Sequence, residues 1–245
     1  MDLQGQRVLV TGSTAGIGQE AATLFARHGA TVIVTGRDPD RGAHTVAAIQ
    51  AEGGSAEFVA ADLGDIDSVR QLAAHAGAVD VLVNNAAATR APFAPTLQQD
   101  TESFDLLFAT NVRAPFFLTA AVLPAMIARG SGAIVNVSTM YASVGVPVGS
   151  PVAATKAALE SFTRSWAAAF GPNGIRVNTV AAGPTRTDVG IEMLGEGLDL
   201  LGSATSIGRA AEPREIAEAI VFLSSPRASY LTGATVAVDG GYTTI

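Results

Sequence analysis

The sequence predicts a doubly wound α/β fold built on a parallel sheet, forming a single domain over residues 1–245. Short runs rich in Val, Ile and Leu alternate with helical patterns from one end of the chain to the other. Continuous apolar runs are typical of strands that helices cover on both faces, and regular alternation of strand and helix is typical of a parallel sheet. A length of 245 residues suits one such domain.

The expected elements follow one another with short connections. Apolar β-branched runs place strands at residues 7–11, 31–35, 57–60, 79–83, 133–137, 175–180 and 234–238, and amphipathic or small-residue patterns place helices at 17–28, 40–51, 66–75, 101–129, 151–170 and 213–224. Glycines stop several of these helices, among them Gly29 and Gly130. Residues 185–206 are rich in glycine and show no firm pattern. They fit a mobile lid over a substrate site or an ordinary surface insertion.

Composition excludes several classes of function. The formal net charge is −7 with no basic cluster, so we expect no nucleic-acid binding. There is no cysteine, which rules out disulfides and thiolate metal sites, and the three histidines lie outside every motif, so no metal site is expected. No apolar run approaches the roughly 18 residues of a membrane span, and the start lacks a signal-peptide pattern. We expect a soluble, cytoplasmic protein.

A glycine-rich turn joins the first strand to the first helix. It reads Thr11-Gly12-Ser13-Thr14-Ala15-Gly16-Ile17-Gly18. Glycines at such a place permit a tight turn and let the backbone approach a pyrophosphate, while the helix N-terminus offers free N–H groups to the phosphates. The position between strand and helix therefore predicts a Rossmann-type dinucleotide site.

The end of the second strand bears on the choice of cofactor. A carboxylate there would bind the ribose 2′-hydroxyl of NAD, but Gly36 takes that place and Arg37 follows. A guanidinium can pair with a 2′-phosphate, which favours NADP(H) over NAD(H). Asp38 could instead turn inward and favour NAD, and Ala15 supplies no second basic group. NADP(H) is therefore the predicted preferred cofactor.

Two segments carry a resemblance to a known family. Ser138-Thr139-Met140-Tyr141 and the later run from Ser150 to Leu159, which contains Lys156, resemble the active-site segment of the short-chain dehydrogenases/reductases, and loosely their 3-oxoacyl-[acyl-carrier-protein] reductase-like members. The resemblance implies a Rossmann-type fold and an oxidoreductase that transfers hydride between a nicotinamide cofactor and a small-molecule ketone or secondary alcohol.

The same resemblance covers essentially the whole chain and assigns roles. It implies cofactor binding by Gly12, Ser13, Thr14, Gly16, Ile17, Gly18, Arg37, Asp62, Leu63, Asn85, Ala86, Lys156, Gly183 and Thr187, and catalytic roles for Asn111, Thr139 and Lys156. The chain departs from the family pattern at Ala87, Val152 and Ala182.

Val152 is the departure that matters most for the chemistry. The family has a Tyr four residues before its Lys, and its phenol is the general acid or base; here that position is Val152. A positioned general acid is worth about 10²–10⁴-fold in rate. Three interpretations stay open: an atypical or introduced change in an ordinary reductase, substitution by the phenol of Tyr141, or a non-catalytic cofactor-binding relative that acts as a sensor or scaffold.

Two helices predict an assembly. Residues 101–129 and 151–170 carry more apolar and small side chains than one core-facing stripe requires, which indicates a second partner. The family pairs these helices across a two-fold axis. We expect a homodimer or homotetramer.

Overall fold

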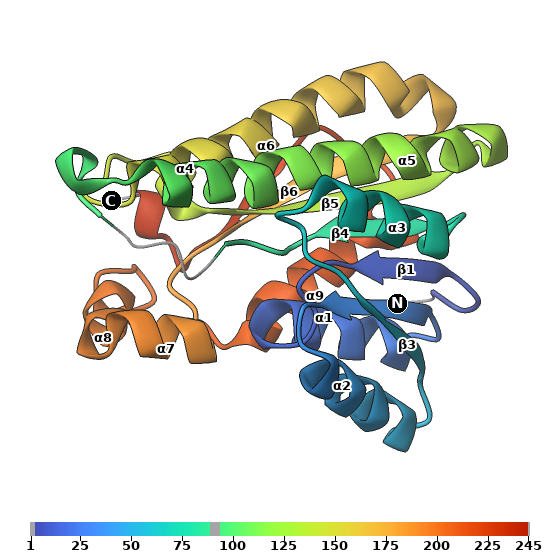
Figure 1. The fold of residues 1–245 in the computed structure, drawn as a ribbon, viewed down its shortest axis with the longest axis horizontal. Helices are drawn as coiled ribbons and strands as arrows, with labels where there is room; N and C mark the ends of the chain where they lie inside the picture. Colours follow the sequence, from blue (N-terminus) through green and yellow to red (C-terminus); the bar gives the residue numbers. More distant parts are fainter. Residues whose placement is uncertain (1–2, 89–93, 245) are drawn as a thin grey trace.

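The computed structural model describes residues 3–88 and 94–244 and confirms the doubly wound fold (Figure 1). Every pairing in its seven-stranded sheet is parallel, and the strand order is β3-β2-β1-β4-β5-β6-β7. The strands are β1 (Arg7–Val10), β2 (Thr31–Gly36), β3 (Ser55–Ala60), β4 (Val81–Asn84), β5 (Gly132–Thr139), β6 (Ile175–Ala182) and β7 (Thr235–Val238).

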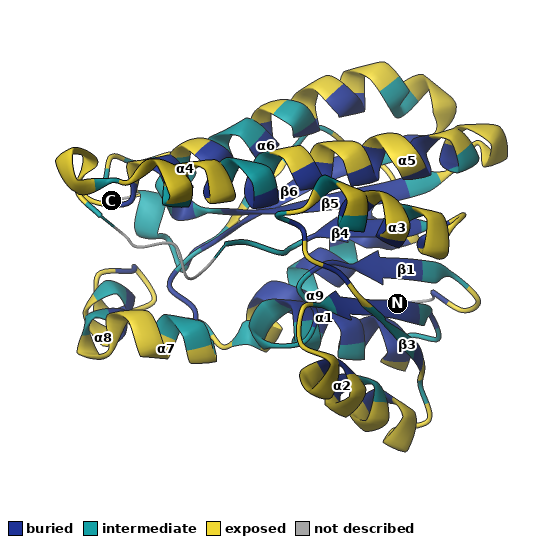
Figure 2. Ribbon diagram, in the orientation of Figure 1, coloured by how far each residue is buried: buried dark blue, intermediate teal, exposed yellow. Residues whose placement is uncertain are grey.

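Helices cover both faces of the sheet. The α-helices are α1 (Gly16–Arg27), α2 (Pro39–Ala51), α3 (Ile66–Ala76), α4 (Thr101–Phe108), α5 (Ala114–Arg129), α6 (Ser150–Phe170), α7 (Asp188–Leu194), α8 (Glu196–Ser203) and α9 (Pro213–Ser224). One core packs α1 and α9 on the sheet, and the other packs α3, α5 and α6 on the opposite face. Figure 2 shows the central strands buried and the outward helix faces exposed.

Successive residues of one strand enter the two cores. Val8 and Val10 of β1 lie in the core under α1 and α9, whereas Leu9 between them lies in the core under α3 and α5. All three side chains are fully buried. Because both faces of the strand are covered, an uninterrupted apolar run satisfies it, which is why the sequence pattern located this strand correctly.

Two expectations need correction. The helix expected over residues 101–129 contains a π-helical segment, Ala109–Arg113, between α4 and α5. Pro115 has no N–H to donate to the carbonyl of Asn111, so the regular α-helical ladder cannot continue there. Residues 185–206, which showed no firm pattern, form α7 and α8, and α7 begins at a side-chain cap by Thr187.

The helical stretch Thr101–Arg129 is long and apolar enough to cross a membrane by length and composition alone, which the sequence analysis did not expect. Half of its most apolar window is buried inside the protein. Packing of α5 against α3 and the sheet accounts for that burial, as in a core helix of a globular domain.

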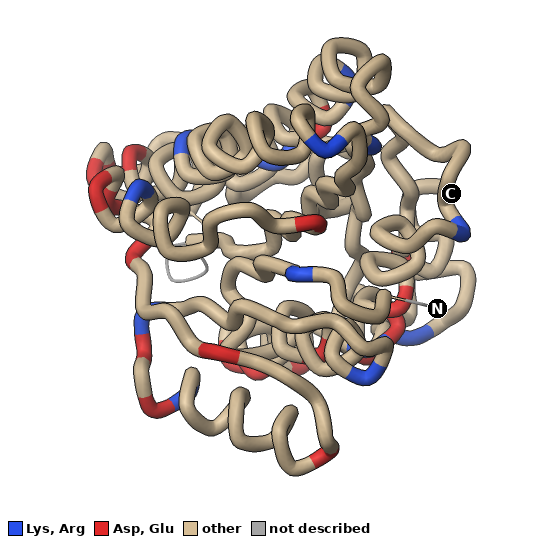
Figure 3. Tube along the Cα trace, turned by 90° about the vertical axis from the view of Figure 1, so that its right-hand side faces the viewer, with Lys and Arg blue, Asp and Glu red and all other residues tan. Residues whose placement is uncertain are grey.

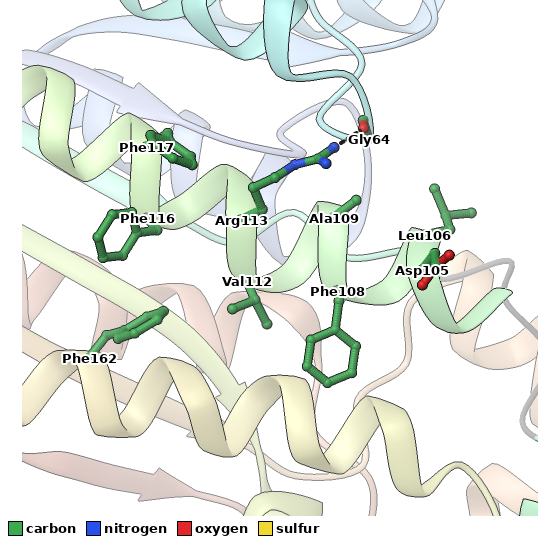
Figure 4. Close-up of a pocket in the computed structure, with 10 residues that line it drawn as sticks. All are labelled: Gly64, Asp105, Leu106, Phe108, Ala109, Val112, Arg113, Phe116, Phe117 and Phe162. Atoms are coloured by element: carbon green, nitrogen blue, oxygen red, sulfur yellow. Dashed lines mark hydrogen bonds between the residues drawn. The ribbon is translucent and has the colours of Figure 1, made fainter. Parts of the chain in front are cut away.

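The outward face of α4 to α6 carries an apolar groove (Figure 4). Its volume is about 660 Å³, and it lies away from the glycine turn. The apolar side chains that line it are Leu106, Phe108, Val112, Phe116, Phe117 and Phe162. Phe116 and Phe117 are 40% and 45% exposed, so a large aromatic surface faces out of the domain.

Candidate active site

The strand order changes direction at β1, with β2 and β3 on one side and β4 to β7 on the other. Ligands of open parallel sheets bind beyond the carboxyl ends of the strands at such a point. A cavity of about 390 Å³ lies there, within the size range of cofactor sites. The predicted residues that line it are Gly12, Thr14, Gly16, Ile17, Gly18, Arg37, Asp62, Leu63, Asn85, Ala86, Lys156 and Thr187.

The glycine turn is shaped so that only glycine fits at its key positions. Gly12 and Gly16 have φ angles of 64° and 55°, in the left-handed region that favours glycine. A Cβ on Gly12 would lie 2.9 Å from the Cα of Ala86, and one on Gly18 would collide with the Gly12 carbonyl oxygen. No side chain caps α1, and its first residues line the cavity, so their uncapped N–H groups can serve a phosphate.

The turn is fixed to the end of β4 by Thr11 and Asn85. The Thr11 hydroxyl donates to the carbonyl oxygen of Val83 (3.1 Å) and accepts from the backbone N–H groups of Asn85 (3.0 Å) and Ala86 (3.1 Å). The Asn85 amide donates back to the carbonyls of Thr11 and Gly12. The side chain of Asn85 thus holds the cradle in place.

Ser13 does not line the cavity. Its hydroxyl is fully buried, donates to the Val10 carbonyl (2.7 Å) and accepts from the Thr35 N–H (2.9 Å). This side chain ties the turn to β2, so its contribution to a ligand is to position the loop rather than to bind with its oxygen.

The end of β2 presents two arginines and no inward carboxylate. Arg37 and Arg41 both line the cavity. Asp38 caps the N-terminus of α2, since its Oδ1 accepts from the N–H groups of Asp40 (3.0 Å) and Arg41 (3.1 Å). A Cβ at Gly36 would lie 2.7 Å from the Thr14 side chain, so no carboxylate fits at that position without moving Thr14.

Asp62 and Leu63 follow β3 at the same edge. The Asp62 Oδ1 accepts from the N–H of Gly64 (2.9 Å), and the Asp62 N–H donates to the Ser68 hydroxyl (2.9 Å). These bonds fix an exposed carboxylate beside the buried Leu63 side chain. The pair can contact the adenine end of a dinucleotide.

Thr139 and Tyr141 lie where β5 ends. Thr139 is half-buried, and its hydroxyl accepts only a long bond from the Tyr141 N–H (3.4 Å). Burial, and then the nearby phenol of Tyr242, raise the pKa of Tyr141. Neither residue lines the cofactor cavity. Among the described residues no cation acts on the pKa of Tyr141, so its environment favours a role in the pocket wall.

Lys156 is the buried cation of the site. Its side chain is 5% exposed, and its Nζ donates to the Val137 carbonyl oxygen at 2.8 Å. Burial lowers its pKa to about 8, because removing an ammonium from water disfavours the charged form. Val152 is half-buried one helical turn earlier, on the same face of α6.

Asn111 serves the framework of the site with its side chain. It is buried in the π-helical segment, where its Oδ1 accepts from the Ala88 N–H (2.9 Å) and its Nδ2 donates to the Thr155 hydroxyl (3.1 Å). Thr155 in turn donates to the Val152 carbonyl (2.7 Å). The amide therefore links the loop after β4 to the first turn of α6.

Gly183 and Thr187 shape the opposite wall. The N–H of Gly183 donates to the Val238 carbonyl (3.0 Å), and a Cβ there would lie 2.5 Å from the Cα of Asp239, so Gly183 serves close packing and does not line the cavity. Thr187 does line it and caps α7 by accepting from the Gly190 N–H (3.0 Å).

Several lining residues were missed from the sequence: Arg41, Leu106, Thr110, Ser138, Asp188 and Val189. Arg41 had a usable signal, because Asp38-Pro39 is a helix start that places Arg41 in the first turn of α2. Asp188 and Val189 had none, since α7 showed no clear pattern. Across residues 3–88 and 94–244, no His, Asp and Glu side chains gather into a group that could hold a metal ion.

Comparisons with known proteins identify the family of the chain. A family model described as enoyl-(acyl carrier protein) reductase matches residues 12–243. The chain is 37% identical to cyclopentanol dehydrogenase of Comamonas testosteroni over 242 residues, 96% of each chain. A solved short-chain dehydrogenase/reductase family protein is 52% identical, covers 100% of both chains and superposes with a TM-score of 0.94. This chain belongs to the short-chain dehydrogenase/reductase family.

A further solved relative contains a bound nicotinamide cofactor. The structure of a gluconate 5-dehydrogenase from Burkholderia cenocepacia, in complex with NADP and tartrate, is 32% identical, covers 100% of this chain and 97% of its own, and has a TM-score of 0.91. The family uses NAD or NADP, and the residues of this chain fit such a group: a glycine cradle that a Cβ would fill, an uncapped helix N-terminus and Lys156 at the far end of the cavity.

Burial of Lys156 should weaken the fold near neutral pH. Its pKa falls from 10.5 unfolded to about 8 folded, so the penalty is full below pH 8 and disappears as pH rises through 10.5. We expect Lys156→Met to raise the free energy of unfolding at pH 7 by up to about 3 kcal/mol and to lose this advantage by pH 11. Urea unfolding between pH 7 and 11 measures both.

The matched control for that experiment is Arg214→Met, an exposed residue of α9 paired with Glu218. It should shift stability by a few tenths of a kcal/mol at most, with little pH dependence. A Lys156→Met protein that is less stable than the wild type at every pH would contradict the buried-ammonium penalty.

Proposed function

We propose that the protein is an NADP(H)-dependent oxidoreductase that transfers hydride between the cofactor and a ketone or secondary alcohol, with turnover weakened by Val152. The observation that carries the proposal is that the glycine turn and Lys156, far apart in the sequence, line one cavity. Membership of an oxidoreductase family supports it. The fold and its relatives also fit a cytoplasmic protein.

The residues of the site have separate roles in this reaction. The bound nicotinamide supplies or accepts the hydride. The glycine turn holds the phosphates, and the Lys156 ammonium places a positive charge beside the reacting end. Within the part of the chain that the structure describes, the Thr139 hydroxyl makes only a long bond with the Tyr141 N–H, so it can donate to a substrate oxygen. Val152 can neither donate nor accept a proton.

The preference for NADP(H) rests on the end of β2. Arg37 and Arg41 present two guanidinium groups to the cavity, which suits a 2′-phosphate. Asp38 is committed to capping α2, so it does not offer a carboxylate to the ribose of NAD. The NADP complex of the gluconate 5-dehydrogenase relative is consistent with this assignment.

The cofactor assignment predicts a measurable preference. NADPH should bind at least tenfold more tightly than NADH in fluorescence titrations at fixed salt, and Arg37→Ala and Arg41→Ala should each weaken NADPH binding by about tenfold, or 1.4 kcal/mol, while leaving NADH binding nearly unchanged. Arg70→Ala is the control, because Arg70 is an exposed arginine of α3 paired with Asp67. Equal affinities for the two cofactors would remove the role given to both arginines.

A second candidate function has one observation in its favour. With Val152 in place of a phenol, and with no tyrosine or histidine among the described residues that line the cavity, the protein could bind the cofactor as a sensor or scaffold without turnover. Replacement of Val152 separates the two functions, because this half-buried side chain lies one helical turn before Lys156, where a phenol could supply the proton.

Val152→Tyr should restore a proton donor one helical turn before Lys156. Under the enzymatic proposal we expect reductase turnover to rise by two orders of magnitude or more, with NADPH affinity kept. The assay is NADPH oxidation with activated ketones and 3-oxoacyl thioesters, wild type beside variant. A wild type that already turns over at about ten per second or faster would show that Val152 does not impair the enzyme. NADPH binding with no turnover by either protein would favour the sensor.

We also propose that the protein assembles as a homodimer or homotetramer through the groove of α4 to α6. Phe116, Phe117 and Phe162 cluster there, and Phe162 stacks on Trp166. At the rim Arg113 donates to the Gly64 carbonyl (Figure 4). An aromatic surface of this kind is typical of an interface between subunits. Figure 3, which views the molecule from the right-hand side of Figure 1, shows Lys and Arg positions as well as Asp and Glu positions along the backbone.

Phe117→Asp tests the assembly. A charge buried in the interface should convert the oligomer to monomer at micromolar concentration in light scattering. Leu200→Asp, on the outside of α8 with 71% exposure, is the control and should leave the mass unchanged. A monomeric wild type would refute the assembly.

A further inference from the structure

Lys156 is the only lysine of the chain. Every other basic side chain among the 15 Lys and Arg residues is an arginine. The one amine side chain is also buried at the carboxyl edge of the sheet, in the same cavity as the glycine turn. An arginine stays charged at all working pH values, whereas a lysine amine can lose its proton when buried.

The contacts of Lys156 leave its proton available. An ammonium has three N–H donors, and the one hydrogen bond of its Nζ within the described residues goes to the Val137 carbonyl. None of the ion pairs between described residues includes it. Glu160, one turn further along α6, is buried as well, but its carboxylate accepts from the Ser138 hydroxyl at 2.7 Å.

Burial without a carboxylate partner has a chemical consequence. The pKa of Lys156 falls to about 8, close to the pH at which a cytoplasmic enzyme works. A general acid is most effective when its pKa lies near the operating pH. The amine can then give up a proton and regain one from solvent within a catalytic cycle, and its neutral form still has an N–H for the Val137 carbonyl.

Other titratable groups near the cavity are less suited to this task. Asp62 and Asp188 line it but belong to exposed turns at its other walls, after β3 and at the start of α7. Tyr141, from the segment after β5, does not line it and has a raised pKa. Tyr242 follows β7 and likewise lies outside the lining. The face of α6 that carries Lys156 has Val152 one turn before it and Glu160 one turn after.

We propose that Lys156 is itself the proton donor of this protein, delivering its proton to the substrate oxygen directly or through one water molecule. This rests on the proposed reductase function. A bound reduced nicotinamide would supply the hydride for the new C–H bond, and the C=O π electrons would move to the substrate oxygen. At that oxygen an Nζ–H bond of Lys156 breaks and an O–H bond forms. Lys156 is left as a neutral amine, which solvent protonates again. Alcohol oxidation runs the same transfers backwards, with the neutral amine as base.

The single lysine allows a direct test that needs no turnover. Protein grown with ¹⁵N,¹³C-lysine gives one Lys side-chain signal in NMR, and its titration reports the Lys156 amine alone. We expect a midpoint near pH 8. A midpoint near the ordinary 10.5 would overturn the proposal whatever the activity, because the amine would then hold its proton too firmly.

Kinetics test the donor role itself. For ketone reduction, kcat/KM should be flat below the NMR midpoint and fall tenfold for each pH unit above it, because the protonated form is required. Lys156→Arg should keep the charge and bind NADPH within a few-fold, yet lose at least 100-fold in turnover together with the pH break. Tyr141→Phe tests the competing phenol and should cost only a few-fold if Lys156 is the donor. The matched control is Tyr230→Phe, at a fully exposed tyrosine outside the site, and it should leave turnover unchanged.

The outcomes separate the two proposals. A 100-fold loss in Tyr141→Phe, a Lys156→Arg variant that retains turnover, or a rate that does not change between pH 6 and 10 would overturn Lys156 as donor and leave the reductase function standing. An inactive wild type beside an active Val152→Tyr variant would do the same. Absence of turnover by both proteins with NADPH bound would instead refute the reductase function, and with it the donor.

Discussion

The reversal of strand order at β1 is the constraint on which the site depends. Two chains of connections leave β1 in opposite directions, so its carboxyl end is flanked by loops that diverge rather than cover it. The Thr11 hydroxyl fixes the glycine turn beside the space between these loops, because it makes hydrogen bonds to three backbone groups at the end of β4. The Asn85 amide completes the connection. A single buried hydroxyl and one amide thus turn a topological gap into a rigid cradle.

A second set of buried hydrogen bonds fixes the position of α6 along its own axis. The Asn84 amide donates to Asn136 (2.9 Å), and the Asn136 amide donates to the Thr163 hydroxyl of α6 (2.8 Å), which bonds to Thr179 of β6 (2.7 Å). Sliding α6 by a turn would strand these buried groups without partners, at about 1–3 kcal/mol each. These hydrogen bonds therefore fix how far Lys156 extends toward the end of β5, where its Nζ donates to the Val137 carbonyl oxygen.

The sequence was informative where local chemistry decides structure. Apolar runs located the strands because both faces of the sheet are covered, and the glycine turn was recognisable because its close contacts exclude any Cβ. The sequence was less informative where the role of a side chain depends on which of several partners it bonds to in the folded protein. That Asp38 caps α2, and so leaves Arg37 and Arg41 unopposed, depends on which of two local roles its carboxylate takes. The direction in which the buried Asn111 amide donates depends on Thr155, which lies far away in the chain.

Ser13 and Asn111 illustrate the limit of a resemblance. A motif assigns a residue to a site, but it does not say whether the side chain contacts the ligand or holds the residues that do. The Ser13 hydroxyl and the Asn111 amide both make hydrogen bonds to protein partners, so each side chain helps to hold the geometry of the site.

At Val152 and Lys156 the question is not how the site is held in shape but which side chain carries the proton. An ammonium buried without a carboxylate opposes folding, and a protein that had only to hold its fold would gain stability from an apolar side chain there. Lys156 is nevertheless the one lysine of the chain, and Val152, one helical turn before it, cannot carry a proton. Proton transfer by the amine in the cavity explains why a lysine stands at this buried position.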